Sequence, residues 1–144
     1  MNYNTKSIRA FIGAINFDES RHFYMELGFE ESMISKDMSY FRISPELGFY
    51  LQNAYVKDWV DNTMIFLEVN NVNEYFTELQ NLGLHNKYKN VKLTPIKEND
   101  WGRECFMHDP SGILWHFGEF FNWYKRLSRP FLIVEFQLLV YIKF

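Results

Sequence analysis

The chain has 144 residues, of which 47% are apolar and 23% are charged, and this mixture predicts one globular domain with a sizeable core. The net charge of -3, with lysines and arginines scattered along the chain, excludes the basic stripe of a nucleic-acid-binding protein. A single cysteine excludes an intramolecular disulfide framework, and the opening MNYNTKSIRAF lacks the apolar segment of a signal peptide. We therefore expect a cytoplasmic protein that has neither nucleic acid nor membrane as a partner.

The first predicted helix follows a β-rich run, SIRAFIGAINF. Asp18 is its predicted N-cap, because a carboxylate can accept from the free N–H groups of the first turn, and Gly28 is its predicted end. Residues with the spacing of one helix face lie between these two ends: Ser20, Phe23, Tyr24 and Leu27.

The second half of the chain repeats this pattern. After the β-rich run NTMIFLEVN, Asn71 is the predicted N-cap of a helix that ends at Gly83. The two predicted caps, Asp18 and Asn71, lie 53 residues apart. The apolar stripe of this helix consists of Val72, Tyr75, Phe76 and Leu79.

Short strands with Pro/Gly turns follow each helix, in YFRISPELGFYLQN and ECFMHDPSGILWHF. The repeating unit is one strand, one helix and three strands, which predicts an α+β fold of two tandem βαβββ modules. We expect a single domain over residues 1–120, with modules at about 5–55 and about 60–120. Residues 121–144 form an apolar extension, predicted to pack as an extra strand or buried arm, or to bind a partner.

The stretch WGRECFMHDPSGILWHFGEF resembles the last hairpin of the bleomycin-resistance proteins, with a Trp-Gly-Arg-Glu run, an Asp-Pro-x-Gly turn and a His-Phe strand. The stretches HFYMELGFE and DNTMIFLEVNNVNEYFTEL fit the same branch of the glyoxalase/bleomycin resistance protein/dioxygenase (vicinal oxygen chelate) superfamily. The resemblance covers about residues 7–120. It implies a glyoxalase/bleomycin-resistance-like fold with cupped mixed sheets, and a homodimer with clefts at the subunit boundary.

Enzymes of this superfamily hold a divalent metal with side chains on the first and last strands of each module. Counting back seven residues from each predicted cap places the first-strand positions at Phe11 and Met64, and the last-strand positions fall at Tyr50 and His116. Only His116 can ligate a metal, whereas a catalytic metal usually needs three protein ligands. We therefore expect no metal and no cofactor.

The chemistry of the last hairpin depends on its register. If DPSG closes the hairpin through its two central residues, Cys105 lies opposite His116. Arg103 then shares their face, whereas Glu104 and His108 point to the other side, so that no carboxylate joins the pair. A Cys–His nucleophile is one interpretation of such a pair, and simple packing of the thiol is the other.

The resemblance places Trp101 at the tryptophan that stacks on the planar tail of the drug. Met33 and Met38 lie near places where the family offers further rings, and methionine adapts to flat apolar ligands without stacking as a ring does. Arg103, on the predicted His116 face, can meet a polar ligand group. The predicted ligand-binding residues are Phe11, Met33, Met38, Tyr50, Met64, Trp101, Arg103 and His116.

These patterns favour a binding protein without catalytic residues. In this hypothesis a homodimer sequesters a planar aromatic antibiotic or metabolite, neutral or cationic, in a cleft. The alternative is a metal-dependent lyase, isomerase or dioxygenase of the same superfamily with an atypical ligand set, or an enzyme that uses Cys105 and His116. A structural or partner-binding role of the apolar extension is a third hypothesis.

Overall fold

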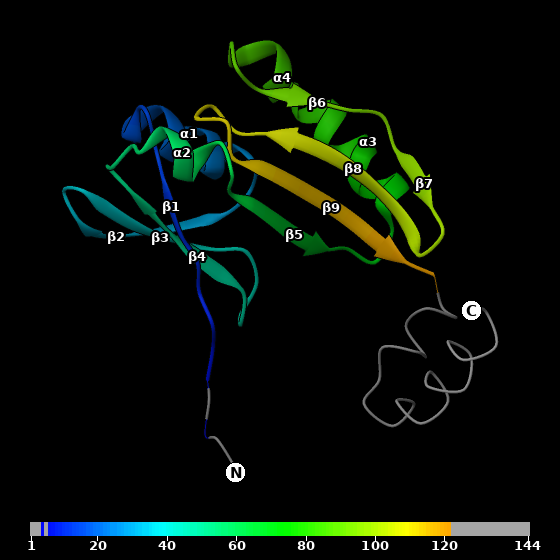
Figure 1. Ribbon diagram of the computed structural model, residues 1–144, viewed down its shortest axis with the longest axis horizontal. Coiled ribbons are helices and arrows are strands. Elements are labelled where there is room, and N and C mark those ends of the chain that lie inside the picture. The colour runs from blue at the N-terminus through cyan, green and yellow to red at the C-terminus, as the bar shows by residue number, and fades with distance from the viewer. Residues whose placement is uncertain (1–3, 5, 122–144) are drawn as a thin grey trace.

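The computed structural model describes residue 4 and residues 6–121, in which two β-sheets lie side by side with their helices packed against them (Figure 1). The predicted α+β architecture of two mixed-sheet modules is confirmed. Within these residues, no helix is both long and apolar enough to cross a membrane. Nearly all of the predicted C-terminal extension, residues 122–144, lies outside the described residues.

Each module begins with a strand and a helix. The first contains β1 (Phe11–Gly13), α1 (Phe17–Glu26), β2 (Glu30–Ser35), β3 (Met38–Arg42) and β4 (Gly48–Gln52). The short helix α2 (Lys57–Val60) leads to the second module. That module contains β5 (Met64–Glu68), α3 (Val72–Leu82), α4 (Leu84–Lys87), β6 (Lys92–Leu93), β7 (Lys97–Asn99), β8 (Gly102–His108) and β9 (Leu114–Phe120).

The two sheets share one topology. Their strand orders are β1-β4-β3-β2 and β5-β9-β8-β6, and β7 also pairs with β8. In each sheet the first strand of the module runs parallel to its last strand, as β1 does to β4 and β5 does to β9, while the other pairs are antiparallel. The predicted internal repeat is therefore present, with two short strands, β6 and β7, where the first module has β2.

The second of the two predicted helix starts is confirmed and the first is wrong. Asn71 caps α3 by accepting from the N–H groups of Asn73 and Glu74, and Gly83 ends the helix with a left-handed φ of 65°. The N-cap of α1 is Asn16, two residues before the predicted cap, and its side chain accepts from the N–H of Glu19. Asp18 instead lies in the first turn, where a negative charge suits the helix dipole.

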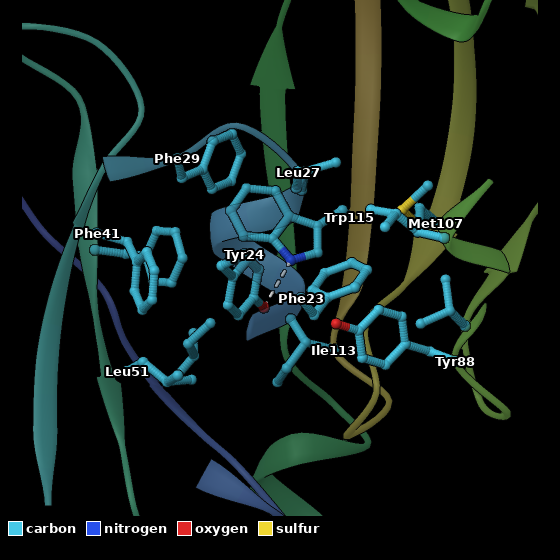
Figure 2. Close-up of a cluster of buried hydrophobic side chains, with 14 of the residues drawn as sticks. Phe23, Tyr24, Leu27, Phe29, Phe41, Leu51, Tyr88, Met107, Ile113 and Trp115 are labelled. Atoms are coloured by element: carbon cyan, nitrogen blue, oxygen red, sulfur yellow. Dashed lines mark hydrogen bonds between the residues drawn. The ribbon is translucent and has the colours of Figure 1, made fainter. Parts of the chain in front are cut away.

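A core of buried aromatic side chains joins the two modules (Figure 2). The ring of Tyr24, on α1, lies 5.4 Å from Phe41 and 4.9 Å from Phe49 in the first sheet, and 5.9 Å from Trp115 in the second. Full burial of one such side chain stabilises the fold by roughly 1.5–3 kcal/mol. The first module is thus held to the second by the same helix that covers its own sheet.

The register of the last hairpin differs by one residue from the prediction. Phe117, and not His116, lies opposite Cys105, because the loop between β8 and β9 is centred on Ser111, and Gly112 adopts a φ of 104°. Cys105 points into the core, where burial raises the pKa of its thiol to about 11. The predicted Cys105–His116 pair does not form, and His108 shares the face of His116.

Candidate ligand-binding site

Aromatic side chains gather on the face of the second sheet that is opposite its helices, which we call the open face. Five of them form the aromatic wall, namely Phe66, Trp101, Phe106, His116 and Phe120. The ring centroid of Phe66 lies 5.9 Å from Trp101, 5.5 Å from Phe120 and 6.2 Å from His116. Phe106 meets the imidazole of His116 edge-on at 4.8 Å. These are separations at which aromatic rings attract one another.

Strand pairing builds this wall. The parallel pairing of β5 and β9 places Phe66 beside His116, and the antiparallel pairing of β8 and β9 places Phe106 on its other side. Trp101 lies in the turn between β7 and β8. The ring of Phe66 lies over Gly118, where a Cβ would come within 2.4 Å of its Cζ. A glycine at this position therefore lets the ring lie close to the sheet.

A carboxylate contacts His116, contrary to the prediction. Oε2 of Glu104 lies 3.0 Å from Nδ1 of His116, and Nδ2 of Asn99 donates to Oε1 of Glu104 at 2.9 Å. A five-residue connection, from Asp109 to Ile113, joins β8 to β9. With a connection of this length, the even-numbered residues of both strands, which include Glu104 and His116, point to the open face. Glu104 was predicted to lie on the opposite face because a two-residue turn was assumed.

A second group of rings lies on the equivalent face of the first sheet. Phe11 stacks on Tyr50 at 4.6 Å with an interplanar angle of 18°, and Tyr40 lies 5.3 Å from Tyr50. The guanidinium of Arg9 lies 4.5 Å from the centre of the Tyr40 ring and donates to the hydroxyl of Tyr50. That hydrogen bond is the main cause of a raised pKa of Arg9. We call these residues the aromatic stack.

One of the four positions that correspond to the metal-ligand positions of superfamily enzymes is Phe66, and not Met64 as predicted. Phe11 lies five residues before the cap Asn16, and five residues before Asn71 is Phe66, not Met64. The cross-strand pairs agree, since Phe11 pairs with Tyr50 and Phe66 with His116. Met64 was predicted because the first helix cap was placed two residues too late.

This donor set does not fit a divalent metal. Three of the four positions hold phenylalanine or tyrosine rings, and only His116 offers a ligand atom of the kind that Zn, Mn or Fe prefers. Within residue 4 and residues 6–121, no group of three or more His, Cys, Asp or Glu side chains is placed to hold a metal ion.

The remaining predicted site residues divide between the two faces of the sheets. Met38 lies on the open face with Tyr40, and Met64 lies on the open face of β5, 66% exposed. Met33 pairs with Ser39, whose side chain is buried on the opposite face. Arg103 is also on the other face, where it pairs with Glu119, so its predicted place beside His116 was wrong.

Two cavities lie between the modules. One, of about 510 Å³, is mostly apolar and includes Phe66 and Phe120 of the aromatic wall in its lining. The other, of about 470 Å³, shares part of this lining and is bordered by three carboxylates, those of Glu68, Glu74 and Glu78. The cavity beside the wall is therefore mostly apolar and includes the carboxylate of Glu68, whereas Glu74 and Glu78 lie on α3 and line only the other cavity.

No protein-family model matches the chain, and no curated protein matches it by sequence. Solved structures do match its fold. The bleomycin-binding protein of Streptomyces verticillus, complexed with copper(II)-bleomycin, is 21% identical over 81% of this chain and 97% of its own, with a TM-score of 0.67. The bleomycin resistance determinant encoded on the transposon Tn5 is 15% identical over 80% of this chain and 98% of its own, also with a TM-score of 0.67.

A solved structure that contains a metal ion also matches. The fosfomycin resistance protein FosX of Listeria monocytogenes, complexed with Mn(II) and sulfate, is 16% identical over 85% of this chain and 94% of its own, with a TM-score of 0.62. The predicted glyoxalase/bleomycin-resistance-like fold is thus confirmed. The chain has the fold that bleomycin-binding proteins share with FosX.

Proposed function

We propose that this protein is a non-catalytic, cytoplasmic binding protein that sequesters a planar aromatic molecule against the aromatic wall. One observation carries the proposal: aromatic rings stand at three of the four positions where enzymes of this fold hold a metal. Rings at these positions provide flat apolar surface for a ligand and remove the donors that metal-dependent catalysis needs. The fold shared with bleomycin-binding proteins supports the same function.

The charge around the wall favours a neutral or cationic ligand. Glu68 lines the cavity that includes Phe66 and Phe120 of the aromatic wall, and the whole chain carries a net charge of -3. A cationic group on the ligand can lie near the carboxylate of Glu68 while its ring system lies on Phe66 and Trp101.

We further propose that the binding cleft is completed in a homodimer. Phe11 is 58% exposed, Met64 66% and Phe66 43%, so that both open faces present large apolar side chains to solvent. Contiguous exposed apolar surface usually marks a binding or assembly site. The aromatic stack of one subunit is a suitable cover for the aromatic wall of another, because each presents aromatic rings on an open sheet face.

Sedimentation of the wild-type protein and of Met64→Lys tests this assembly. Met64 is exposed on the open face, so the substitution is expected to leave the fold intact and to shift the protein from dimer to monomer. A wild-type protein that is monomeric at all concentrations, yet binds its ligand, would contradict the dimer proposal.

Tryptophan fluorescence tests the binding function. The protein is titrated with bleomycin and with a panel of flat aromatic compounds, and the titrations are repeated with Trp101→Ala. Loss of one stacked ring is expected to weaken binding by about twofold to tenfold. Trp59→Ala is the matched control, because Trp59 lies on α2 with 73% of its surface exposed and away from the wall. Equal ligand affinities of Trp101→Ala and Trp59→Ala would show that Trp101 is not part of the binding site.

Metal analysis tests the enzymatic alternative. The purified protein is expected to contain no stoichiometric Mn, Fe, Ni or Zn, and its ligand affinity is expected to be unchanged by chelators. A metal that is lost together with function in His116→Ala would contradict the binding-protein proposal.

A further inference from the structure

The contact between Glu104 and His116 determines which nitrogen of the imidazole carries a proton. A carboxylate only accepts hydrogen bonds, and both oxygens of Glu104 do so, one from Asn99 and the other from Nδ1 of His116 at 3.0 Å. The side chain of Glu104 is only 10% exposed, so the pair is held inside the wall. Nδ1 of His116 therefore carries the hydrogen, and in the neutral ring Nε2 carries a lone pair.

This lone pair has no partner. Among the residues that the structure describes, no donor reaches Nε2 of His116, although the atom is covered by protein. The rings of Phe66 and Phe106 flank the imidazole at 6.2 and 4.8 Å, and neither offers an N–H or O–H group. A buried acceptor without a partner is unfavourable, which makes Nε2 a place where a donor from another molecule gains more than it would at the surface.

The ring of Phe66 lies beside the imidazole of His116 and is partly exposed. Phe66 lies over Gly118 beside His116, is 43% exposed, and belongs to the open face of an edge strand. A flat ligand that takes the place of the Phe66 ring, or displaces it by rotation about its side-chain bonds, lies next to the imidazole. The ligand then meets one directional polar atom on an otherwise apolar wall, which is how small-molecule sites usually obtain orientation.

We propose that the pair Glu104–His116 is the polar anchor of the aromatic wall, and that it selects planar ligands which carry an N–H or O–H donor on the ring edge. This inference rests on the proposed function and deepens it by naming the chemical class of the ligand. Glu104 acts as a positioning residue, since it fixes the tautomer of His116, and His116 acts as the acceptor.

Three probes of similar size test the selectivity. Indole offers one N–H donor, quinoline offers one ring-nitrogen acceptor, and naphthalene offers neither. Their affinities are measured by NMR titration of the full chain. For the wild-type protein, indole is expected to bind between about twofold and tenfold more tightly than naphthalene, whereas quinoline is expected to bind no better than naphthalene.

The variant Glu104→Gln is expected to reverse this preference. Oε1 of the glutamine still accepts from Asn99, so its amide NH2 faces Nδ1 of His116 and donates to it. The hydrogen of the imidazole then moves to Nε2, which becomes a donor and favours quinoline over indole. A residue that only supports the fold would change the affinities of all three probes together.

Two further variants complete the series. His116→Phe keeps a flat ring and is expected to bind the three probes with equal affinity. His108→Phe removes a histidine from the same face, two strand positions beyond Phe106, and is expected to keep the preference for indole. ¹⁵N spectra of the His116 ring, recorded without any ligand, report the tautomer directly and do not depend on a variant that folds.

The outcomes separate this inference from the proposed function. Binding of all three probes to the wild-type protein with equal affinity would overturn the anchor and leave the aromatic site intact. A lone pair on Nδ1 in the ¹⁵N spectrum would also overturn the anchor. Absence of binding by every probe, and by the larger compounds in the fluorescence titration, would overturn both proposals.

Discussion

The hydroxyl of Tyr24 donates to Oδ2 of Asp109 at 2.7 Å, and this hydrogen bond joins α1 of the first module to the β8–β9 loop of the second. The same hydroxyl accepts from Nε1 of Trp115 at 3.1 Å (Figure 2). The other oxygen of Asp109 accepts from the N–H groups of Ser111 and Ile113. A carboxyl group with no exposed surface is thus satisfied by donors from both halves of the chain.

Asp109 is expected to make stability depend on pH. Its burial raises the pKa of the carboxyl group to about 6, although the hydrogen bonds from Tyr24 and the loop oppose this shift. Because the pKa is higher in the folded protein than in the unfolded chain, Asp109 favours folding most below about pH 4, and this contribution is lost as the pH rises through about 6. The free energy of unfolding of the wild-type protein, measured relative to Asp109→Asn, is expected to fall by up to about 3 kcal/mol over this range.

Urea unfolding at several pH values measures this difference. Asp100→Asn is the control, because Asp100 is exposed in the turn before Trp101 and asparagine suits a turn equally well. A difference between wild type and Asp109→Asn that stays constant from pH 4 to pH 7 would show that the hydrogen bonds offset burial completely.

Glu31 is expected to have the opposite pH dependence. Two hydrogen bonds from the guanidinium of Arg21, at 2.5 and 3.0 Å, lower the pKa of Glu31, and a hydrogen bond from Ser39 adds to this effect. The stabilising contribution is therefore present above the unfolded pKa of about 4.3 and is lost as the pH falls through the lower folded value. Glu31→Gln is expected to cost roughly 1–3 kcal/mol at neutral pH and less in acid.

Thermal unfolding of Glu31→Gln and the wild-type protein at pH 7 and pH 3 measures this change. The exposed pair Lys57–Asp61 provides the control, since Asp61→Asn is expected to change stability by less than about 1 kcal/mol at either pH. Equal losses of stability in Glu31→Gln and Asp61→Asn would contradict the larger contribution expected of Glu31.

Cys105 is expected to be unreactive in the folded protein. Its side chain has no exposed surface, and burial raises the pKa of the thiol to about 11, so the nucleophilic thiolate is scarce at neutral pH. Reaction with a thiol reagent at pH 8 is expected only after unfolding in denaturant. Rapid modification of the native protein would restore the interpretation of Cys105 as a nucleophile.

Substitution by alanine is expected to have different effects at Gly118 and at Gly112. At Gly118 a Cβ would lie 2.4 Å from the end of the Phe66 ring, which can rotate away, so Gly118→Ala is expected to cost less than about 1 kcal/mol but to change ligand affinity. At Gly112 a Cβ has free space, but the φ of 104° is strained for alanine, so Gly112→Ala is expected to cost about 1–3 kcal/mol. Unfolding and binding measurements on both variants distinguish the steric effect of an added Cβ from the strain of the backbone.

The two long helices, α1 and α3, and the order of the strands along the chain were predictable because their signals are local. The predicted stripe of α1 is buried, and Asn71 and Gly83 bound α3 as predicted. The cap of α1 was predicted wrongly because Asn16 and Asp18 are both good capping residues, and the choice between them depends on where the chain leaves β1.

The site was less predictable, because the residues that line it depend on whether the loop between β8 and β9 has an even or an odd number of residues. DPSG is compatible with a two-residue turn or with a longer loop that has Gly112 in a left-handed conformation, and the difference of one residue moves every side chain to the other face. Glu104 and His108 were therefore placed on the side of the sheet away from His116. Phe66 was missed because the offset of seven residues, which came from the misplaced cap Asp18, was also applied to the correct cap Asn71.

Ser111 also contacts the first module. Its hydroxyl accepts from the N–H of Ile15 at 2.9 Å and lies 3.1 Å from the hydroxyl of Ser20, in a buried contact. A loop that closes the last hairpin therefore supplies partners to the first helix, some ninety residues earlier in the chain. Although the two halves are repeats in topology, neither contains all the groups that satisfy its own interior. We therefore expect them to fold together as one cooperative unit, with the first half completed only after the last hairpin has been synthesised.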